Sequence, residues 1–407
     1  MRIVRDLQPR REPPRADVAE ILAEVRRRGD DAVLEFTERF DKAELGPGEL
    51  RVDARELEAA VGVLEPAVLE GLRTSIANVR AVAKAQLSDP VEVDLPEGQQ
   101  VAVSELPVDR VGVYVPGGRA PYPSTVVMCA ITARVAGVQR IAVCAPPGPG
   151  GRAHPAILAA CVLCEVSEVY RMGGAQAIAA LAYGTESVPA VDVIAGPGNA
   201  WVTEAKRQVF GQVGIDGLAG PSELLVVASS GADPELIALD LLAQAEHGEE
   251  SPLWLLSPDA NLVDAVVAEV ERLAPERQSA TEAQLQAIAV DELGEALALA
   301  EQVAPEHLQL VGADAEALAD RVRRAGCVFV GAGAGTAFGD YVAGSNHVLP
   351  TGGAARFQSA LSPATFRRRM ARVSLPGEAP ARLAPAGAAL ARAEGFPVHA
   401  ESMERRA

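Results

Sequence analysis

The stretch Val111-Gly-Val-Tyr-Val-Pro-Gly-Gly118 decides the fold class, because a short β-branched run passes directly into a glycine-rich turn. Similar short apolar runs alternate with helical patterns in the rest of the chain; they begin at Val101, Ile141, Val191 and Leu224. Strands that alternate with helices predict a parallel sheet with helices on its faces. We therefore expect an α/β protein.

Three glycine-rich turns follow predicted strands, at residues 116–124, 173–176 and 196–199. In a parallel sheet such turns lie at the carboxyl ends of the strands, where helix N-termini offer free N–H groups to anionic ligands. Together they indicate a nucleotide or cofactor crevice, although tight turns need glycine whether or not they bind anything. A later run, 331–335, is no dinucleotide fingerprint, because position 336 is threonine where the last glycine belongs.

The regions on either side of the predicted sheet are more helical. Residues 14–40 predict two helices broken at Gly29, and residues 53–87 predict a long helical run that ends at Asp89-Pro90. A second region follows after Trp254, with one more strand at Val328. From about residue 361 onward we expect helices separated by prolines, with too few apolar residues to fold alone. This tail is expected to pack on another domain or another subunit.

Composition excludes several classes of protein. The chain has 407 residues and a formal net charge of −18, which disfavours nucleic acid and anionic membranes as partners. No uncharged stretch approaches the length of a membrane span, and no secretory signal is visible. Five cysteines are an odd number and suit a reducing cytoplasm. Cys161 and Cys164 have C-x-x-C spacing, but their apolar helical surroundings predict core residues.

Polar residues in the second half of the chain suggest chemistry. A helix capped by Asp233 carries Gln244 and His247 on one face, able to meet one ion or ligand. A histidine favourably placed at a helix C-terminus is the simpler interpretation of that pair. Glu306 and His307 are adjacent titratable groups that could divide proton transfers, and a surface loop explains them equally well.

Two further pairs extend this polar set. Asp340 and His347 lie in a predicted glycine-rich loop, and Glu394 and His399 lie in the tail. Glutamine, histidine and aspartate side chains form a mixed nitrogen and oxygen ligand set that suits zinc. Ligands so dispersed along the chain cannot be proven from their spacing.

At this point the motifs resemble those of the histidinol dehydrogenase family, in the family's order and over nearly the whole chain. Each motif is weak by itself, but the ordered set is specific. The motifs are Val111-Gly-Val-Tyr-Val-Pro-Gly-Gly, Gly173-Gly-Ala-Gln-Ala-Ile-Ala-Ala-Leu-Ala-Tyr-Gly-Thr, Gly196-Pro-Gly-Asn, Ala219-Gly-Pro-Ser-Glu, Gln244-Ala-Glu-His-Gly, Pro305-Glu-His-Leu and Gly339-Asp-Tyr-Val-Ala-Gly-Ser-Asn-His-Val-Leu-Pro.

The resemblance implies an NAD-dependent, zinc-containing enzyme that oxidises L-histidinol through L-histidinaldehyde to L-histidine, the last two steps of histidine biosynthesis. It implies that His307 is the general base and that Glu306 activates water. The implied zinc ligands are Gln244, His247, Asp340 and His399. The implied NAD contacts are Tyr114, Gln176 and Asn199. The implied substrate contacts are Ser222, Gln244, His247, His307, Asp340, Glu394 and His399, and His347 is an expected neighbour of the site.

The resemblance also implies a homodimer in which the C-terminal tail, with Glu394 and His399, completes the partner's site. We accordingly expect two incomplete Rossmann-like parallel-sheet domains, a helical N-terminal scaffold and a helical tail exchanged in the dimer. The expected domains are residues 1–110 with 221–360, which hold the zinc and catalytic loops, residues 111–220, which hold the NAD-contacting turns, and the tail 361–407.

Other functions stay open on the residues alone. A zinc- and NAD-dependent dehydrogenase of another small alcohol would use much of the same set. A metal-dependent hydrolase would use Glu306 and His307 on water and would not bind NAD. A non-catalytic small-molecule-binding protein of two α/β lobes would need neither the metal nor this pair for turnover. Without the resemblance, the residues indicate an α/β enzyme and leave the nucleotide and the metal open.

Overall fold

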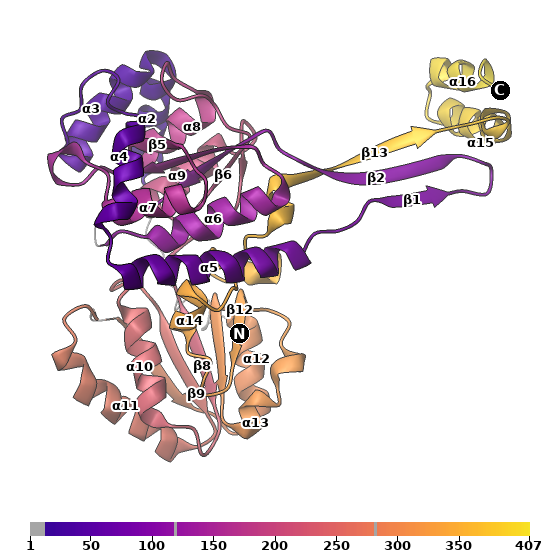
Figure 1. Cartoon of the computed structure of the whole chain (residues 1–407). Helices are drawn as coiled ribbons and strands as arrows, with labels where there is room; N and C mark the ends of the chain where they lie inside the picture. Colours follow the sequence, from indigo (N-terminus) through magenta and orange to yellow (C-terminus); the bar gives the residue numbers. More distant parts are fainter. Residues whose placement is uncertain (1–12, 118–119, 281–282) are drawn as a thin grey trace. The chain divides into compact units, whose positions relative to one another are not determined.

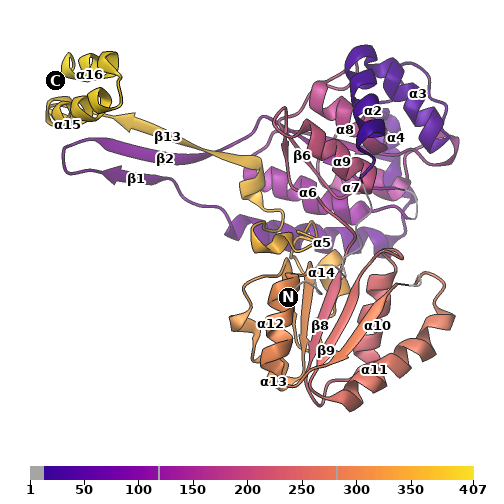
Figure 2. The same cartoon turned by 180° about the vertical axis from the view of Figure 1, so that it is seen from behind.

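The computed structural model describes residues 13–117, 120–280 and 283–407. Figures 1 and 2 show the chain from opposite sides. It divides into two compact units, the first of residues 1–85 and 109–366, the second of residues 86–108 and 367–407. Among the described residues, no helix is both long enough and apolar enough to cross a bilayer.

The first sheet of the first unit is parallel and has five strands. Its strands, in spatial order, are β5 (Glu168–Arg171), β4 (Arg140–Ala145), β3 (Arg110–Tyr114), β6 (Val193–Ala195) and β7 (Gly214–Ile215). The helices that alternate with them are α6 (Pro123–Ala136), α7 (Pro155–Leu163), α8 (Gly174–Tyr183) and α9 (Ala200–Val209). The central strand β3 is buried along its whole length, which explains its apolar run. The predicted parallel sheet is confirmed.

The N-terminal helices pack on the helices that flank this first sheet. They are α2 (Arg15–Arg28), α3 (Asp30–Asp41), α4 (Ala54–Ala59) and α5 (Pro66–Ala85). Gly29, with a φ of 57°, separates α2 from α3 as predicted. The apolar face of α2 joins the same core as α8, so α2 and α3 lie with residues 110–215. The domain division expected from the sequence instead places these helices with residues 221–360. The prediction of one long helical run over residues 53–87 is wrong, because the helix is interrupted before Pro66, where α5 begins.

The second sheet repeats the same strand order with parallel pairing. In spatial order its strands are β10 (Leu285–Ala289), β9 (Leu253–Ser257), β8 (Leu224–Ala228), β11 (His307–Val311) and β12 (Cys327–Val330). Its helices are α10 (Pro234–Ala245), α11 (Ala260–Leu273), α12 (Leu293–Val303), α13 (Ala313–Glu316) and α14 (Thr336–Tyr341). Successive residues of β8 contribute to two different cores, one on each face of the sheet. Strand β10 was not predicted.

Short 3₁₀ turns complete the first unit; they are η1 (Ala60–Val63), η2 (Pro149–Gly151), η3 (Ala274–Glu276), η4 (Ala319–Arg321), η5 (Ala354–Arg356) and η6 (Pro363–Phe366). Cys161 and Cys164 are buried and unpaired, so the prediction of core thiols is confirmed. Burial raises the pKa of the Cys164 thiol to about 12, which leaves it unreactive at neutral pH.

The second unit consists of a three-stranded antiparallel sheet and two helices. The strands are β1 (Val91–Asp94), β2 (Gln100–Pro107) and β13 (Arg367–Ser374), and the helices are α15 (Ala379–Ala393) and α16 (Pro397–Glu404). The run at Val101 therefore belongs to an antiparallel sheet, and its assignment to the parallel sheet was wrong. Strand β13 was missed, and Pro385 lies inside α15 where a helix boundary was expected. The buried core of this unit is small, formed by Ala388, Ala391 and Ala400.

Candidate active site

The neighbouring strands β8 and β11 bring polar residues together at their amino ends. Leu224 pairs with His307 in the parallel register, so the residues just before each strand lie side by side. Ser222 donates a hydrogen bond from Oγ to Glu306 Oε2 at 2.5 Å. The backbone N–H of Glu223 donates to the same oxygen at 2.9 Å. The Glu306 carboxylate is thus held in a fixed orientation.

Helix α10 returns the chain from the carboxyl end of β8 to this amino edge, because the next strand, β9, runs parallel to β8. It begins, as predicted, with Asp233, whose carboxylate accepts from the N–H of Glu235. At its other end Gln244 donates from Nε2 to Ser222 Oγ at 2.8 Å. His247 lies two residues after the end of the helix. Gln244 thus contacts Ser222, and His247 lies near Asp340 and His307.

Asp340 joins the cluster from helix α14 and not from the predicted loop. Its Oδ2 lies 4.0 Å from Nε2 of His247. The backbone carbonyl of Asp340 is 2.9 Å from Nδ1 of His347, and Nε2 of His347 is 3.4 Å from Oγ1 of Thr125. Thr125 belongs to α6, at the carboxyl edge of the first sheet. The two sheets of the first unit therefore meet at this cluster, the first by its carboxyl edge and the second by its amino edge.

The hydrogen bonds of His307 define its chemistry. Its Nδ1 lies 3.0 Å from the backbone carbonyl of Glu223 and 3.5 Å from Glu306 Oε2, both of which are acceptors when Glu306 is ionised. The proton of the neutral imidazole therefore belongs on Nδ1, and the lone pair on Nε2 is free to accept another proton. Burial lowers the pKa of His307, although the charge of Asp340 opposes this effect. His307 is thus neutral and able to act as a base at neutral pH.

Glu306 has the opposite shift. Burial raises its pKa to about 8, even though the hydrogen bonds from Ser222 and Glu223 favour the carboxylate. A carboxyl group with a pKa near neutrality can both take and give a proton. Two adjacent residues with pKa values shifted in opposite directions are typical of an acid–base pair in an active site.

The donor set near His247 suits a divalent metal. The amide nitrogen of Gln244 is used by Ser222, which leaves its oxygen for a ligand, and His247 and Asp340 supply nitrogen and oxygen donors. In the described part of the chain, no three His, Cys, Asp or Glu side chains form a group able to hold a metal. His399 and Glu394 belong to the second unit, where the His399 ring lies 5.3 Å from that of Phe396.

The three glycine turns converge at the carboxyl edge of the first sheet. A side chain at Gly196 would begin 2.0 Å from the carbonyl oxygen of Tyr114, and side chains at Gly117 and Gly173 would collide with Pro146. Glycine is therefore required where these turns approach one another. Of the first turn, residues 118–119 lie outside the described residues.

Each predicted NAD contact lies in one of these turns or, for Tyr114, just before it. Tyr114 ends β3 and accepts a hydrogen bond at its hydroxyl from the N–H of Gly174. Gln176 is 1% exposed, and neither atom of its amide has a hydrogen-bond partner among the described residues. Asn199 caps α9 by accepting from the N–H groups of Trp201 and Val202. A buried amide with both ends unbonded is costly, so Gln176 fits a ligand that offers a donor and an acceptor.

A model of the histidinol dehydrogenase family matches residues 8–407. The chain belongs to the histidinol dehydrogenase family. It is 47% identical to the histidinol dehydrogenase of a Synechococcus strain over 397 residues, covering 96% of this chain and 92% of the relative. It is 48% identical to that of Deinococcus radiodurans over 403 residues, covering 97% and 91%. The crystal structure of histidinol dehydrogenase from Elizabethkingia anophelis superposes with a TM-score of 0.94 at 33% identity, covering 100% of this chain and 96% of that one.

Membership of the histidinol dehydrogenase family makes the chain an oxidoreductase and confirms the family expected from the motifs. The structure brings six of the expected site residues into one cluster; they are Ser222, Gln244, His247, Glu306, His307 and Asp340. His347 is a direct neighbour of this cluster.

Sequence reasoning assigned no role to Glu223, which touches both Glu306 and His307. One signal could have found it. Ser222-Glu223 precedes the predicted strand at Leu224, and Glu306-His307 precedes the short apolar run Leu308-Gln-Leu-Val. Parallel pairing of these two runs would place the two polar segments together.

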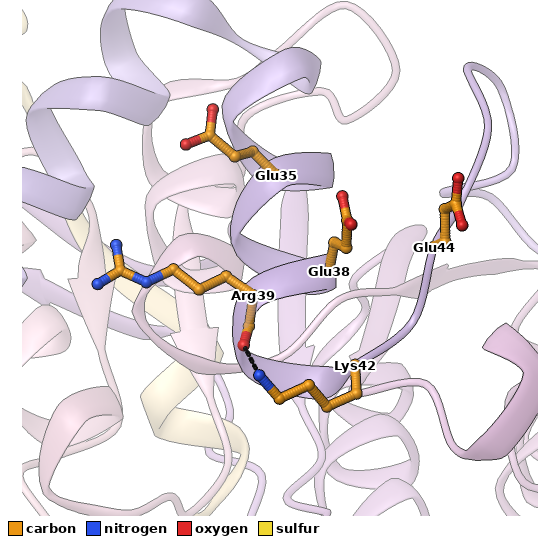
Figure 3. Close-up of a pocket in the computed structure, with 5 residues that line it drawn as sticks. All are labelled: Glu35, Glu38, Arg39, Lys42 and Glu44. Carbon is orange, nitrogen blue, oxygen red and sulfur yellow. Dashed lines mark hydrogen bonds between the residues drawn. The ribbon is translucent and has the colours of Figure 1, made fainter.

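A charged hollow on α3 is no part of this cluster. It has a volume of about 530 Å³ and is lined by Glu35, Glu38, Arg39, Lys42 and Glu44 (Figure 3). Two of its charged side chains are engaged locally: Glu35 pairs with Arg28 at 2.6 Å, and Lys42 Nζ donates to the carbonyl of Arg39. Exposed pairs of this kind are weak and give no reason to assign a ligand.

Proposed function

We propose that the protein oxidises L-histidinol to L-histidine through L-histidinaldehyde, the last two steps of histidine biosynthesis, with two molecules of NAD as hydride acceptors. The observation that carries this proposal is the hydrogen-bonded cluster of Ser222, Gln244, Glu306 and His307 at the amino edge of the second sheet, in a chain of the histidinol dehydrogenase family. The five cysteines are unpaired, in keeping with a cytoplasmic location.

His307 serves as the base in this reaction. Its Nε2 takes the proton of the substrate alcohol while the hydride leaves, because Nδ1 is already bonded to the carbonyl of Glu223. Glu306 then activates the water that adds to the aldehyde, which gives the hydrate needed for the second oxidation. Ser222 bridges Gln244 and Glu306 and contacts the substrate. Both oxidations thus occur in one place, without release of a reactive aldehyde.

Four residues would hold zinc: Gln244, His247, Asp340 and His399. Support comes from the two donors of His247 and Asp340, 4.0 Å apart, since two ligands of one zinc ion bound at about 2.0–2.1 Å lie roughly 3.4 Å from each other. When bound, the metal orients the imidazole and amine of histidinol against the hydride acceptor. Gln244, His247, Asp340 and His399 would thereby also contact the substrate, together with Glu394.

NAD would be contacted by Tyr114, Gln176 and Asn199. The convergence of their three turns and the unbonded amide of Gln176 support this assignment. Residues 111–220 would then be the cofactor-contacting domain, and residues 221–360 would carry the catalytic loops.

The second unit supports a homodimer in which residues 361–407 complete the partner's site through Glu394 and His399. Large apolar side chains of this unit are exposed; among them are Val91, Val373, Leu390, Phe396 and Val398. A unit with so small a core needs a partner surface to bury them. His399→Ala and His247→Ala should each be inactive alone. Randomly paired in equal amounts, they should restore one of the two sites of each mixed dimer, which is about a quarter of all sites. Absence of any recovery in dimers shown to mix would contradict tail exchange.

NADH formation from limiting L-histidinol and excess NAD tests the proposed function. We expect two NADH per histidinol, loss of the reaction with a chelator and recovery with zinc. If the folded, zinc-loaded protein forms no NADH from histidinol, the assignment of this substrate is wrong, and turnover of another small alcohol would identify the alternative dehydrogenase. Hydrolysis without NAD would indicate a hydrolase.

A further inference from the structure

Glu223 lies directly before β8, and only 1% of its surface is exposed. The parallel pairing of Leu224 with His307 brings it opposite Glu306. Burying a carboxyl group costs free energy, so the presence of Glu223 beside Glu306 and His307 needs a specific reason.

The backbone of Glu223 binds both residues of the acid–base pair. Its N–H donates to Glu306 Oε2 at 2.9 Å. Its carbonyl accepts from the backbone N–H of His307 at 3.2 Å and lies 3.0 Å from His307 Nδ1. The position of this one peptide segment therefore sets the orientation of the Glu306 carboxylate and the tautomer of His307.

The side chain of Glu223 fixes the same peptide segment through hydrogen bonds to two other parts of the chain. Its Oε1 accepts from the backbone N–H of Glu306 at 3.2 Å and from the N–H of Gly352 at 2.9 Å. The residue before Gly352, Thr351, in turn accepts from the N–H of Gly220 through its Oγ1 at 2.5 Å. Residues 220–223, 306 and 351–352 are thus joined in one closed set of hydrogen bonds around Glu223.

We propose that Glu223 is a positioning residue for the Glu306–His307 pair, whose carboxyl oxygen locks the strand starts of β8 and β11 to residues 351–352. The proposal rests on the proposed function for its kinetic consequence, but the contact itself is a property of the folded chain. What the reaction needs from Glu223 is an acceptor at Oε1 and not a negative charge.

Burial and the neighbouring Glu306 carboxylate raise the pKa of Glu223 to about 8, which agrees with a group that does not need its charge. The other titratable groups nearby are His307, 3.5 Å from Glu306, and Asp340, whose charge acts on both Glu306 and His307. His247 interacts with His307 and Asp340. A glutamine would keep an acceptor oxygen and remove the charge, with an NH2 group in place of the second oxygen. A methionine of similar size would remove both.

The test compares Glu223→Gln with Glu223→Met in the zinc-loaded full chain, by kcat and KM for histidinol at saturating NAD. We expect the glutamine variant to keep kcat within about threefold of the parent, because the acceptor is preserved. We expect the methionine variant to lose about 100-fold in kcat with little change in KM, because the reacting groups shift by a fraction of an ångström while substrate binding is retained. Equal losses in both variants, or a changed KM with an unchanged kcat, would overturn the proposal.

Two controls separate positioning from general damage. Glu204→Met removes another buried carboxyl group, on α9, where it pairs with Arg207, and should leave kcat unchanged. If Glu223→Met does not fold, Glu223→Asp takes its place, since the shorter side chain withdraws the oxygen from both amides. A kcat of Glu223→Asp equal to that of Glu223→Gln would contradict the requirement for a placed acceptor.

Amide hydrogen exchange provides a readout that needs no turnover. The N–H groups of Glu306 and Gly352 should exchange at least tenfold faster in Glu223→Met than in Glu223→Gln, because each loses its acceptor. If histidinol is not oxidised at all but this difference is seen, the proposed function fails and the positioning contact stands. Equal exchange in the two variants would overturn the contact.

Discussion

The two five-stranded sheets of the first unit have the same strand order but present opposite edges to the candidate active site. The first sheet offers its carboxyl edge, built of close glycine turns with one unbonded amide, Gln176. The second offers its amino edge, built of titratable groups such as Glu306 and His307. On the proposed function, one topology would serve two purposes, cofactor binding and proton transfer, and the residues at the edge would decide between them.

The difference follows from what each purpose requires. Close approach of backbone turns needs glycine at several positions, and it leaves little room for side chains that do chemistry. Proton transfer needs buried side chains held by hydrogen bonds, which the paired starts of β8 and β11 supply. We therefore expect changes at the second sheet to affect kcat and changes at the first sheet to affect the KM for NAD.

The largest effect is expected at the second sheet, from His307→Asn. Loss of the base should lower kcat by about 10²- to 10⁴-fold, with little change in KM for NAD. Steady-state NADH formation from histidinol measures this. The matched control is His154→Asn, since His154 is exposed and only caps α7 through its Nδ1. If His307→Asn kept the kcat of the parent, the proposed role of His307 and of the amino edge of the second sheet in the chemistry would be wrong.

The pH dependence of kcat sharpens the same assignment. Burial lowers the pKa of His307, so the base is neutral above that pKa and becomes protonated, and inactive, below it. We expect kcat to fall on the acid side with a midpoint below about 6.5, the ordinary value for histidine. This midpoint should be absent from the residual rate of His307→Asn. If the residual kcat of His307→Asn still falls at the same midpoint, the group that titrates there is not His307.

At the first sheet, Gln176→Leu should raise the KM for NAD by about tenfold, because the amide that would pair with the cofactor is lost. The kcat at saturating NAD should change little. Since leucine also removes two unbonded buried polar atoms, the variant should be no less stable than the parent. If changes at the two sheets affected kcat and the KM for NAD to the same extent, the division of roles between the sheets would be wrong. Gln139→Leu, at an exposed position before β4, is the control.

The smallest effect is expected from the caps of two helices of the second sheet. Asp233→Ala and Asp259→Ala each remove an N-cap, of α10 and of α11, and each should lower the free energy of unfolding by about 1 kcal/mol. Only α10 ends at Gln244 and His247, so only Asp233→Ala should also weaken zinc binding. Thermal unfolding and zinc titration check this pair. Identical zinc affinities would show that the start of α10 does not influence its ligand-bearing end.

The sequence predicts those parts of the fold in which local pattern and burial agree. Strand β3 is apolar because both of its faces are buried, and helix α10 is marked by Asp233 at its start. Strand β13 was not predictable in this way, because its arginines are exposed and its partner β2 is distant in the chain. Pairing in β13 depends on backbone hydrogen bonds that no side-chain pattern reports.

The candidate site shows the same limit. The motifs identified Glu306 and His307, but the role of Glu223 depends on the register between β8 and β11, which no single segment encodes. Asp340 was expected in a loop because its neighbourhood is rich in glycine, whereas it lies in the six-residue helix α14. Sequence reasoning thus picked out Glu306 and His307 but gave no role to Glu223, which contacts both of them.

The pairing of β2 with β13 has a consequence for the synthesis of the chain. Arg367 and Glu105, which meet in this pairing, are 262 positions apart, so a ribosome adding about 5–20 residues per second completes β13 roughly ten to fifty seconds after β2. Throughout that interval one edge of β2 has no partner strand and can pair with another nascent chain. A message truncated after β2 but before residue 367 makes this exposure permanent, so such shortened chains should aggregate.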